Sequence, residues 1–155
     1  MIRIQKEDFN VQEEMDAFKS DCPKIGAICC FTGLVREFGD RTDLTGMFLE
    51  HYPGMTEKAL QKIINQAHER WPIEHVRVIH RVGELNLSDQ IVFVGVSSAH
   101  REASFAACEF IMDYLKVEAP FWKKERTTSG ENWVEEKGTD QQRAERWKDQ
   151  TTLKD

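Results

Sequence analysis

The sequence predicts a single α+β domain. Three observations lead to this prediction: helical and strand-forming segments alternate, the strand-forming runs come in unequal pairs, and no linker, repeat or low-complexity block divides the chain. A chain of 155 residues is long enough to bury one substantial core. We expect residues 1–150 to form this domain and residues 151–155 to be a flexible tail.

A short helix and two strands are predicted in the first third of the chain. Asn10 followed by Glu13 resembles a capping box, and apolar residues keep helical spacing from there to about Lys19. The runs IGAICCFTGLVRE (25–37) and DLTGMFLEHY (43–52) are rich in strand formers and are separated by an exposed loop. They predict two successive strands.

A long helix and two strand-forming runs follow. Thr56 is expected to be the N-cap of a helix that ends at Arg70, because Trp-Pro comes directly after it. In HVRVIHRVGEL (75–85), valines alternate with polar residues, as in a strand with one buried face. DQIVFVGVSS (89–98) is apolar throughout, which indicates a strand buried on both faces.

The last third predicts a second long helix, a hairpin and a final helix. Ser98 is expected to cap the long helix, whose inward stripe is Phe105, Cys108, Met112 and Leu115. After Pro120, residues 121–137 resemble two short strands joined around Ser129-Gly130. The helical pattern TDQQRAERWKD occupies residues 139–149.

Composition and charge exclude several classes of protein. With 40% hydrophobic and 31% charged residues, the chain is typical of a globular protein. The formal net charge of -6 argues against a general nucleic-acid binder. The N-terminus lacks the apolar core of a signal peptide, and the longest apolar run, IVFVGV, is too short to cross a bilayer. We therefore expect a cytoplasmic protein that binds neither nucleic acid nor membrane.

The cysteines do not indicate a metal site. Cys22, Cys29, Cys30 and Cys108 form no CxxC pair, and the adjacent pair would point to opposite faces of a strand. Buried free thiols are the favoured interpretation. Because nucleotide-binding, hydrolase and zinc-protease motifs are also missing from the sequence, we expect neither a metal nor a cofactor.

Cations gather around the predicted long helix between Ser98 and Pro120, although the protein is acidic. Lys116 lies at its C-terminal end, and Lys123 follows Pro120 and an aromatic pair, Phe121-Trp122. A lysine in this position commonly complements the helix dipole or pairs with Asp113 one turn back. An amine beside aromatic rings and other cations is also more easily deprotonated, which would suit it to act as acid, base or nucleophile.

Three further cations are candidates for anion binding. His100 and Arg101 lie in the first turn of the helix, where a phosphate can also meet the backbone amides. Arg36 follows a strand in which Gly33 marks a bulge or a close backbone approach. Each of them could equally be a solvent-exposed surface charge. The residues themselves thus support a cationic, lysine-containing site for an anionic substrate or an acidic partner segment.

Six segments together resemble the large, catalytic subunit of molybdopterin synthase. In chain order they are FTGLVR, LEHYPGMTEKAL, VIHRVGEL, VFVGVSSAHR, FIMDYLK and APFWKKE. The resemblance implies an α/β-hammerhead fold with an additional antiparallel β subdomain. It also implies a sulfurtransferase of molybdenum cofactor biosynthesis, which converts cyclic pyranopterin monophosphate (precursor Z) into the dithiolene of molybdopterin.

The same resemblance implies partners. The large subunit is expected to form a homodimer, and each copy to bind a small β-grasp sulfur-carrier subunit, giving a heterotetramer. The carrier's C-terminal Gly-Gly tail, ending in a thiocarboxylate, would enter the large subunit's pocket and supply the sulfur.

The resemblance also assigns residues. Lys116 and Lys123 match the family's two essential lysines, whereas Phe31, Arg36 and Met112 match pocket residues. A further pair, His100 and Arg101, matches the substrate-phosphate region, which in the family comes from the neighbouring protomer.

Two positions depart from the family pattern. Leu34 stands where relatives often have lysine, and Lys137 stands where an arginine can occur in the substrate site. Lysine lacks the bidentate fork of arginine, so the geometry of the anion site can differ here.

Two other functions are compatible with the cations alone. A non-catalytic module could use them to dock an acidic segment, and a Schiff-base enzyme could use Lys116 as its nucleophile. The first would produce no molybdopterin, and the second would be trapped by borohydride with a carbonyl substrate.

Overall fold

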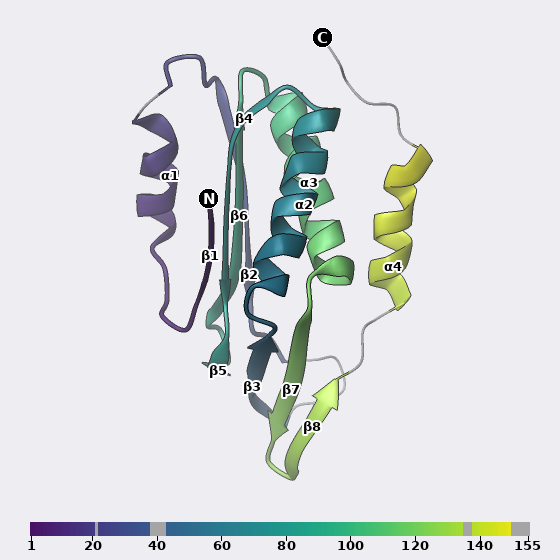
Figure 1. Ribbon diagram of the computed structural model, residues 1–155. Coiled ribbons are helices and arrows are strands. Elements are labelled where there is room, and N and C mark those ends of the chain that lie inside the picture. The colour runs from purple at the N-terminus through teal and green to yellow at the C-terminus, as the bar shows by residue number, and fades with distance from the viewer. Residues whose placement is uncertain (21, 38–42, 135–137, 150–155) are drawn as a thin grey trace.

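The computed structural model describes residues 1–20, 22–37, 43–134 and 138–149 and confirms the α+β class. Within these ranges, two four-stranded sheets are accompanied by four α-helices (Figure 1). The predicted tail at 151–155 lies outside the described residues. The elements are β1 (Ile2–Gln5), α1 (Val11–Lys19), β2 (Ala27–Leu34), β3 (Leu44–His51), α2 (Met55–Arg70), β4 (Ile73–Arg81), β5 (Gly83–Asn86), β6 (Gln90–Ser98), α3 (Arg101–Glu118), β7 (Phe121–Thr127), β8 (Gly130–Val134), α4 (Gly138–Glu145) and a 3-10 turn (Arg146–Asp149).

The first sheet has the strand order β1-β4-β6-β2 and forms the middle layer of the molecule. Helices α2 and α3 cover one face and α1 covers the other (Figure 1). β1 runs parallel to β4, whereas the other pairs are antiparallel. The prediction that β6 is buried on both faces is confirmed, because every side chain from Val92 to Ser98 is buried. The main core lies between this sheet and helices α2 and α3.

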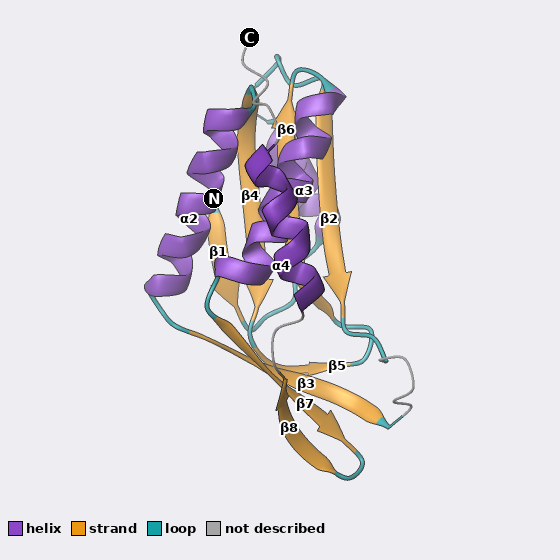
Figure 2. Cartoon of the chain, turned by 90° about the vertical axis from the view of Figure 1, so that its right-hand side faces the viewer, coloured by secondary structure: helices purple, strands orange, loops and turns teal. Residues whose placement is uncertain are grey.

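The second sheet is antiparallel, with the order β5-β3-β7-β8, and lies at one end of the first (Figure 2). It is the additional antiparallel subdomain expected from the sequence. The predicted hairpin around Ser129-Gly130 is confirmed as β7 and β8. Because Pro120 ends the long helix, the chain passes directly from α3 into β7 at the junction of the two sheets.

Helix α1 begins as predicted, but α2 does not. The side chain of Asn10 accepts a hydrogen bond from the backbone N–H of Glu13 at 3.1 Å. Thr56 is not the N-cap of α2, because the helix begins at Met55 after Gly54, whose φ is +85°. The buried Thr56 hydroxyl instead donates to the Pro120 carbonyl at 3.1 Å, joining the start of α2 to the end of α3.

Two predictions for α3 are also wrong. Ser98 is the last residue of β6 and its hydroxyl bonds with that of Ser104, so His100 is the N-cap. Phe105 is 63% exposed and does not belong to the inward stripe. At 100° per residue it lies only about 20° around the helix from the buried Met112, so its exposure comes from its place in the second turn of α3 and not from the face of the helix.

Two strand boundaries differ from the sequence prediction. β1 has no counterpart among the predicted strands; its four residues obtain backbone partners only by pairing with β4. The run at 75–85 is divided between the two sheets, because the chain turns at Gly83 with a φ of +84°.

Helix α4 is held against α3 by one buried carboxylate. Asp113 accepts hydrogen bonds from Nε of Arg143 at 3.1 Å, Nη2 of Arg146 at 2.9 Å and Nε1 of Trp147 at 2.7 Å. The Trp147 ring packs in the main core against Phe110. The C-terminal segment is therefore anchored to the middle of the long helix.

The cysteines are free, but only one of them is buried. Cys108 is in the core, Cys22 and Cys29 are half-buried and Cys30 is exposed, because β2 is an edge strand. Within the described ranges, no group of three metal-ligating side chains comes together. None of the described helices is long and apolar enough to span a membrane.

Candidate active site

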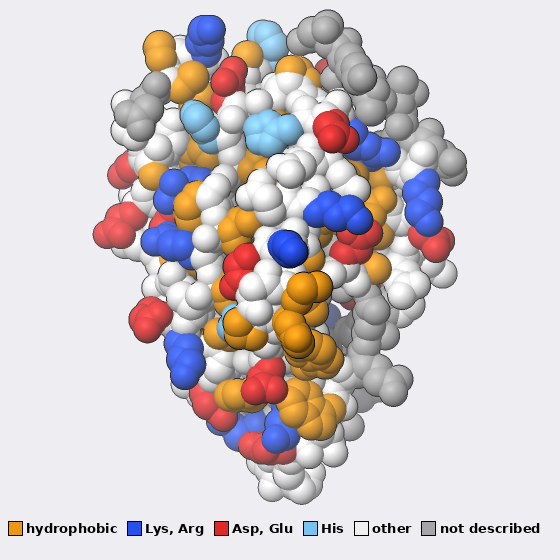
Figure 3. Space-filling view, in the orientation of Figure 1, with side chains coloured by type: hydrophobic (Ala, Val, Ile, Leu, Met, Phe, Trp, Pro, Cys, Tyr) orange, Lys and Arg blue, Asp and Glu red, His pale blue; other side chains and the backbone are white. Residues whose placement is uncertain are grey.

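A cavity of about 880 Å³, here called the junction cavity, lies where α3 passes into β7. Its lining comes from both sheets, from the end of α3 and from the start of α4. Hydrophobic side chains are exposed together over this part of the surface, with charged side chains on either side (Figure 3). The cavity is large enough for a drug-sized ligand or for the end of an extended peptide.

The structure brings three predicted cations into this cavity. Arg36 follows β2, Lys116 lies in the last turn of α3, and Lys123 lies on β7. Lys123 is paired with Leu49 on β3 and with Val134 on β8, so the sheet fixes its backbone. The cations thus come from three separate elements, and a single anionic ligand could contact all of them.

The remaining walls are largely aromatic. Trp122 and Trp133 line the cavity and are 48% and 56% exposed, and Leu34 is 53% exposed. Lys124 lies with its Nζ 5.1 Å from the centroid of the Trp133 ring. The aromatic pair beside Lys123 was visible in the sequence, but nothing there placed Trp133 next to it.

His80, on β4, also lines the junction cavity. Its Nδ1 lies 2.8 Å from the backbone oxygen of Arg81, and its ring stacks on Phe121 with centroids 3.8 Å apart. Burial, together with the positive charge of Lys116, lowers the pKa of His80 to about 4. At neutral pH this histidine is therefore uncharged, with the proton on Nδ1.

One sequence signal could have identified His80. Val76 and Val78 alternate with polar residues on β4, and position 80 is the next on the same face. The histidine thus occupies an inward-facing position.

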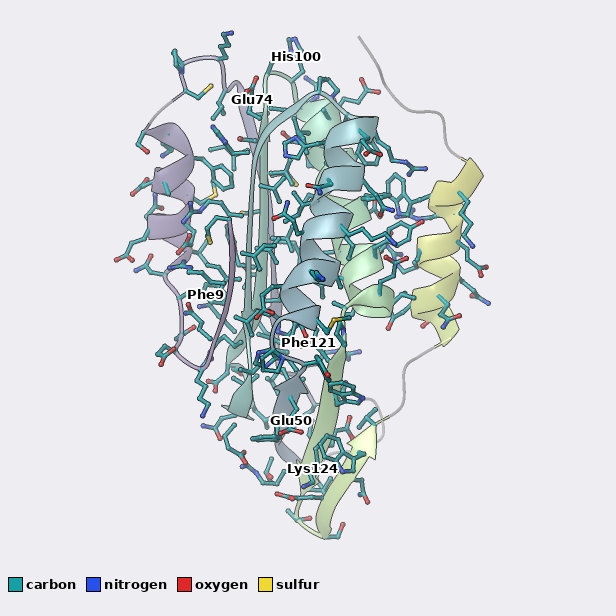
Figure 4. The ribbon with its side chains drawn as sticks, viewed as in Figure 1. Phe9, Glu50, Glu74, His100, Phe121 and Lys124 are labelled. Atoms are coloured by element: carbon teal, nitrogen blue, oxygen red, sulfur yellow. The ribbon has the colours of Figure 1, made fainter. Side chains whose placement is uncertain are left out.

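His100 and Arg101 are not brought to this cavity within one protomer. They line a second cleft, of about 850 Å³, together with Gly26, Ala27 and Phe105. Figure 4 shows His100 at the opposite end of α3 from Phe121. With a rise of 1.5 Å per residue, Arg101 is about 22 Å along the helix from Lys116.

Two other predicted residues, Phe31 and Met112, lie apart from the lining. Phe31 is 44% exposed on the edge strand β2, beside Gly33, where the register of β2 shifts. Met112 packs in the main core, one turn before Lys116. Lys137 lies outside the described residues.

Comparison with known proteins gives consistent matches. Residues 4–118 match the family described as MoaE protein. The molybdopterin synthase catalytic subunit of Vibrio cholerae is 54% identical over 146 residues, covering 94% of this chain and 97% of the relative. The structure of the molybdopterin biosynthesis MoaE protein from Burkholderia ambifaria is 52% identical, with a TM-score of 0.82, and the match covers 97% and 99% of the two chains.

A more distant structure shares the fold. It is a protein-protein complex of subunits 1 and 2 of molybdopterin-converting factor from Helicobacter pylori, matched with 17% identity and a TM-score of 0.74. The match covers 88% of this chain and 91% of that one.

Proposed function

We propose that this chain, which belongs to the family of molybdopterin synthase catalytic subunits, transfers sulfur in its junction cavity. The chain is an enzyme of molybdenum cofactor biosynthesis. The sulfur donor is the C-terminal thiocarboxylate of a small carrier subunit, and the acceptor is precursor Z. The observation that supports this proposal most is the convergence of Arg36, Lys116 and Lys123 on one cavity with aromatic walls.

The cavity has the charge that this reaction requires. A thiocarboxylate is an anion, precursor Z contains a phosphate, and negative charge develops on the tail carbonyl oxygen during acyl and sulfur transfer. Cations that are already held in place stabilise such charge without reorganising during the reaction. We assign Lys116 and Lys123 to the carrier's terminal thiocarboxylate, and Arg36 to the anionic substrate.

The shape of the cavity suits a narrow tail. An extended Gly-Gly terminus allows the backbone to approach the walls closely, because glycine has no Cβ. Phe121, Trp122 and Trp133 provide the apolar walls of such a slot. The tail would contribute mainly through its charge, and the globular β-grasp body of the carrier would bury most of the apolar area.

A second protomer would complete the site. His100 and Arg101 are about 22 Å from Lys116 along α3, too far to share one ligand within a single chain. In the proposed homodimer, the neighbour's pair binds the phosphate of precursor Z, assisted by the amides of the first turn of α3. Two large and two small subunits then form the heterotetramer.

A reconstituted assay tests the function. Purified protein, thiocarboxylated carrier and precursor Z should yield molybdopterin, whereas carrier ending in an ordinary carboxylate should yield none. A docking module would yield no product with either carrier. Borohydride trapping of a carbonyl substrate on Lys116 would favour the Schiff-base alternative instead.

Mixed dimers test whether the site spans two protomers. Lys116→Ala and Arg101→Ala homodimers should both be inactive, because each of their sites has one defect. A purified dimer with one copy of each variant has one intact site if the protomers share sites, and should regain about half of the wild-type activity. If the mixed dimer stays inactive, each protomer uses its own pair.

A further inference from the structure

We propose that His80 positions the amine of Lys116 by accepting a hydrogen bond from it at Nε2. The inference rests on the proposed function of the junction cavity and adds a residue to it. It depends on three features of the structure: the tautomer of His80, the rigidity of its ring and the groups that face it.

The hydrogen bond at Nδ1 determines the tautomer. A backbone carbonyl can only accept, so the 2.8 Å contact with the Arg81 oxygen places the ring proton on Nδ1. In the neutral ring, Nε2 is then a hydrogen-bond acceptor. Among the described residues the only buried side-chain nitrogen or oxygen without a partner is Nη1 of Arg70, so Nε2 of His80 is accessible from the cavity that it lines.

The ring is held in one orientation. The residue is only 6% exposed, and its backbone is paired with Ile4 on β1 and Val92 on β6. On one side the ring stacks on Phe121 with an angle of 17° between the planes. A side chain that is fixed on a central strand can define the position of a flexible partner.

Lys116 is the candidate donor, because it lines the same cavity as His80. The charged or titratable groups that act on His80 are Lys116 on α3 and His51 on β3. The carboxylate of Asp113, one turn before Lys116, is occupied by Arg143 and Arg146. Among the described residues, Lys116 has no salt-bridge or hydrogen-bond partner in this structure, so the bond to His80 would form by a rotation of its flexible side chain. One cavity therefore contains an unused donor and an unused acceptor.

A neutral acceptor has a specific advantage here. A carboxylate in the same place would also hold the amine, but it would repel the incoming thiocarboxylate and cancel the charge of Lys116. An uncharged imidazole orients the lysine and leaves the positive charge of the cavity available to the ligand.

Two substitutions separate the acceptor from the rest of the histidine. His80→Asn can still donate to the Arg81 carbonyl but has nothing at the position of Nε2, whereas His80→Gln places an amide oxygen near that position. In the reconstituted assay, we expect His80→Asn to lower kcat about 10- to 100-fold and to leave the KM for precursor Z within about two-fold. His80→Gln should recover kcat to within about five-fold of wild type.

The controls distinguish positioning from folding. His75→Asn, at an exposed position of the same strand, should keep the wild-type kcat. Thermal unfolding should show similar stability for the two His80 variants. Equal kcat losses in the Asn and Gln variants, or an effect confined to KM, would overturn the inference.

A second readout does not depend on activity. In an NMR spectrum of protein with 15N-labelled histidine, the Nε2 resonance of His80 should shift in Lys116→Ala and stay in place in Lys123→Ala. An unmoved resonance in both variants would refute the contact even if the wild-type enzyme makes molybdopterin. If the wild-type protein makes none, the proposed function fails, and the resonance still decides whether Lys116 and His80 interact.

Discussion

Burial of the neutral His80 should make the stability of the protein depend on pH. Burial holds the pKa of this imidazole at about 4, compared with 6.5 when it is free in solution. Below pH 6.5 the unfolded chain therefore takes up a proton that the folded protein does not. Binding this proton lowers the free energy of the unfolded state. The free energy of unfolding is therefore highest above pH 6.5 and falls as the pH is lowered towards 4.

The size of the effect follows from the two pKa values. At pH 7 the folded histidine binds almost no proton and about a quarter of the unfolded molecules bind one, which lowers the free energy of unfolding by only about 0.2 kcal/mol. At pH 5 the unfolded histidine is almost fully protonated and the folded one is not, so the free energy of unfolding is lower by about 2 kcal/mol. Near pH 4 and below, the loss approaches about 3 kcal/mol, which corresponds to the whole shift.

Urea unfolding at pH 7 and pH 5 measures this loss. Other groups also titrate in this range, so the quantity to compare is the change between the two pH values in wild type and in His80→Gln, at one protein concentration. We expect the change in the variant to be smaller by about 2 kcal/mol. His75→Gln shows how much of the change comes from removing an exposed histidine of the same strand.

The outcome bears directly on the site. If wild type and His80→Gln lose the same stability between pH 7 and pH 5, His80 does not stay neutral in the folded protein. The assignment of the proton to Nδ1 and of an acceptor to Nε2 would then be wrong.

Three further predictions concern the site and the fold. Lys116→Ala should fold normally and lose about 10²- to 10³-fold in kcat in the reconstituted assay, and a folded variant with most of its activity would contradict its role. Asp113→Ala removes the acceptor of the Trp147 Nε1–H, while Arg143 and Arg146 keep Glu109 as a partner, and it should lower the free energy of unfolding by about 2 kcal/mol in urea; a loss under about 0.5 kcal/mol would mean that the segment is held otherwise. A hydrogen bond from the Cys108 thiol lowers the pKa of Cys29 to about 7, whereas burial raises that of Cys30. Iodoacetamide at pH 7 should therefore modify Cys29 before Cys30, and mass spectrometry showing the opposite order would refute this.

Local sequence determined most of the secondary structure. Helix α1 follows from the capping side chain of Asn10 and the spacing of its apolar residues, and β6 follows from one uninterrupted apolar run. Pro120 ends α3 because proline has no backbone N–H to donate and its ring clashes with the preceding helical turn. The class of site was also visible, because clustered cations in a protein with a net charge of -6 indicate an anionic ligand.

The boundaries of several helices and strands depend on contacts that the local sequence does not show. Thr56 and Ser98 both belong to residue types that commonly cap helices. The Thr56 hydroxyl bonds instead to Pro120, which is distant in sequence, and the Ser98 hydroxyl bonds to Ser104, which lies inside α3. Strand β1 depends on β4 for its backbone hydrogen bonds, and its Ile-Arg-Ile-Gln alternation is too short to predict a strand by itself.

The composition of the site was decided by the tertiary structure. Arg36, Lys116 and Lys123 meet because α3 turns into β7 where the two sheets join, a contact between segments far apart in the chain. His80 is an ordinary strand residue by sequence, and it becomes an oriented, neutral acceptor only when Phe121 covers its ring and the Arg81 carbonyl binds its proton. The types of side chain are determined by the sequence, but distance, burial and protonation state arise only when the folded chain brings these side chains together.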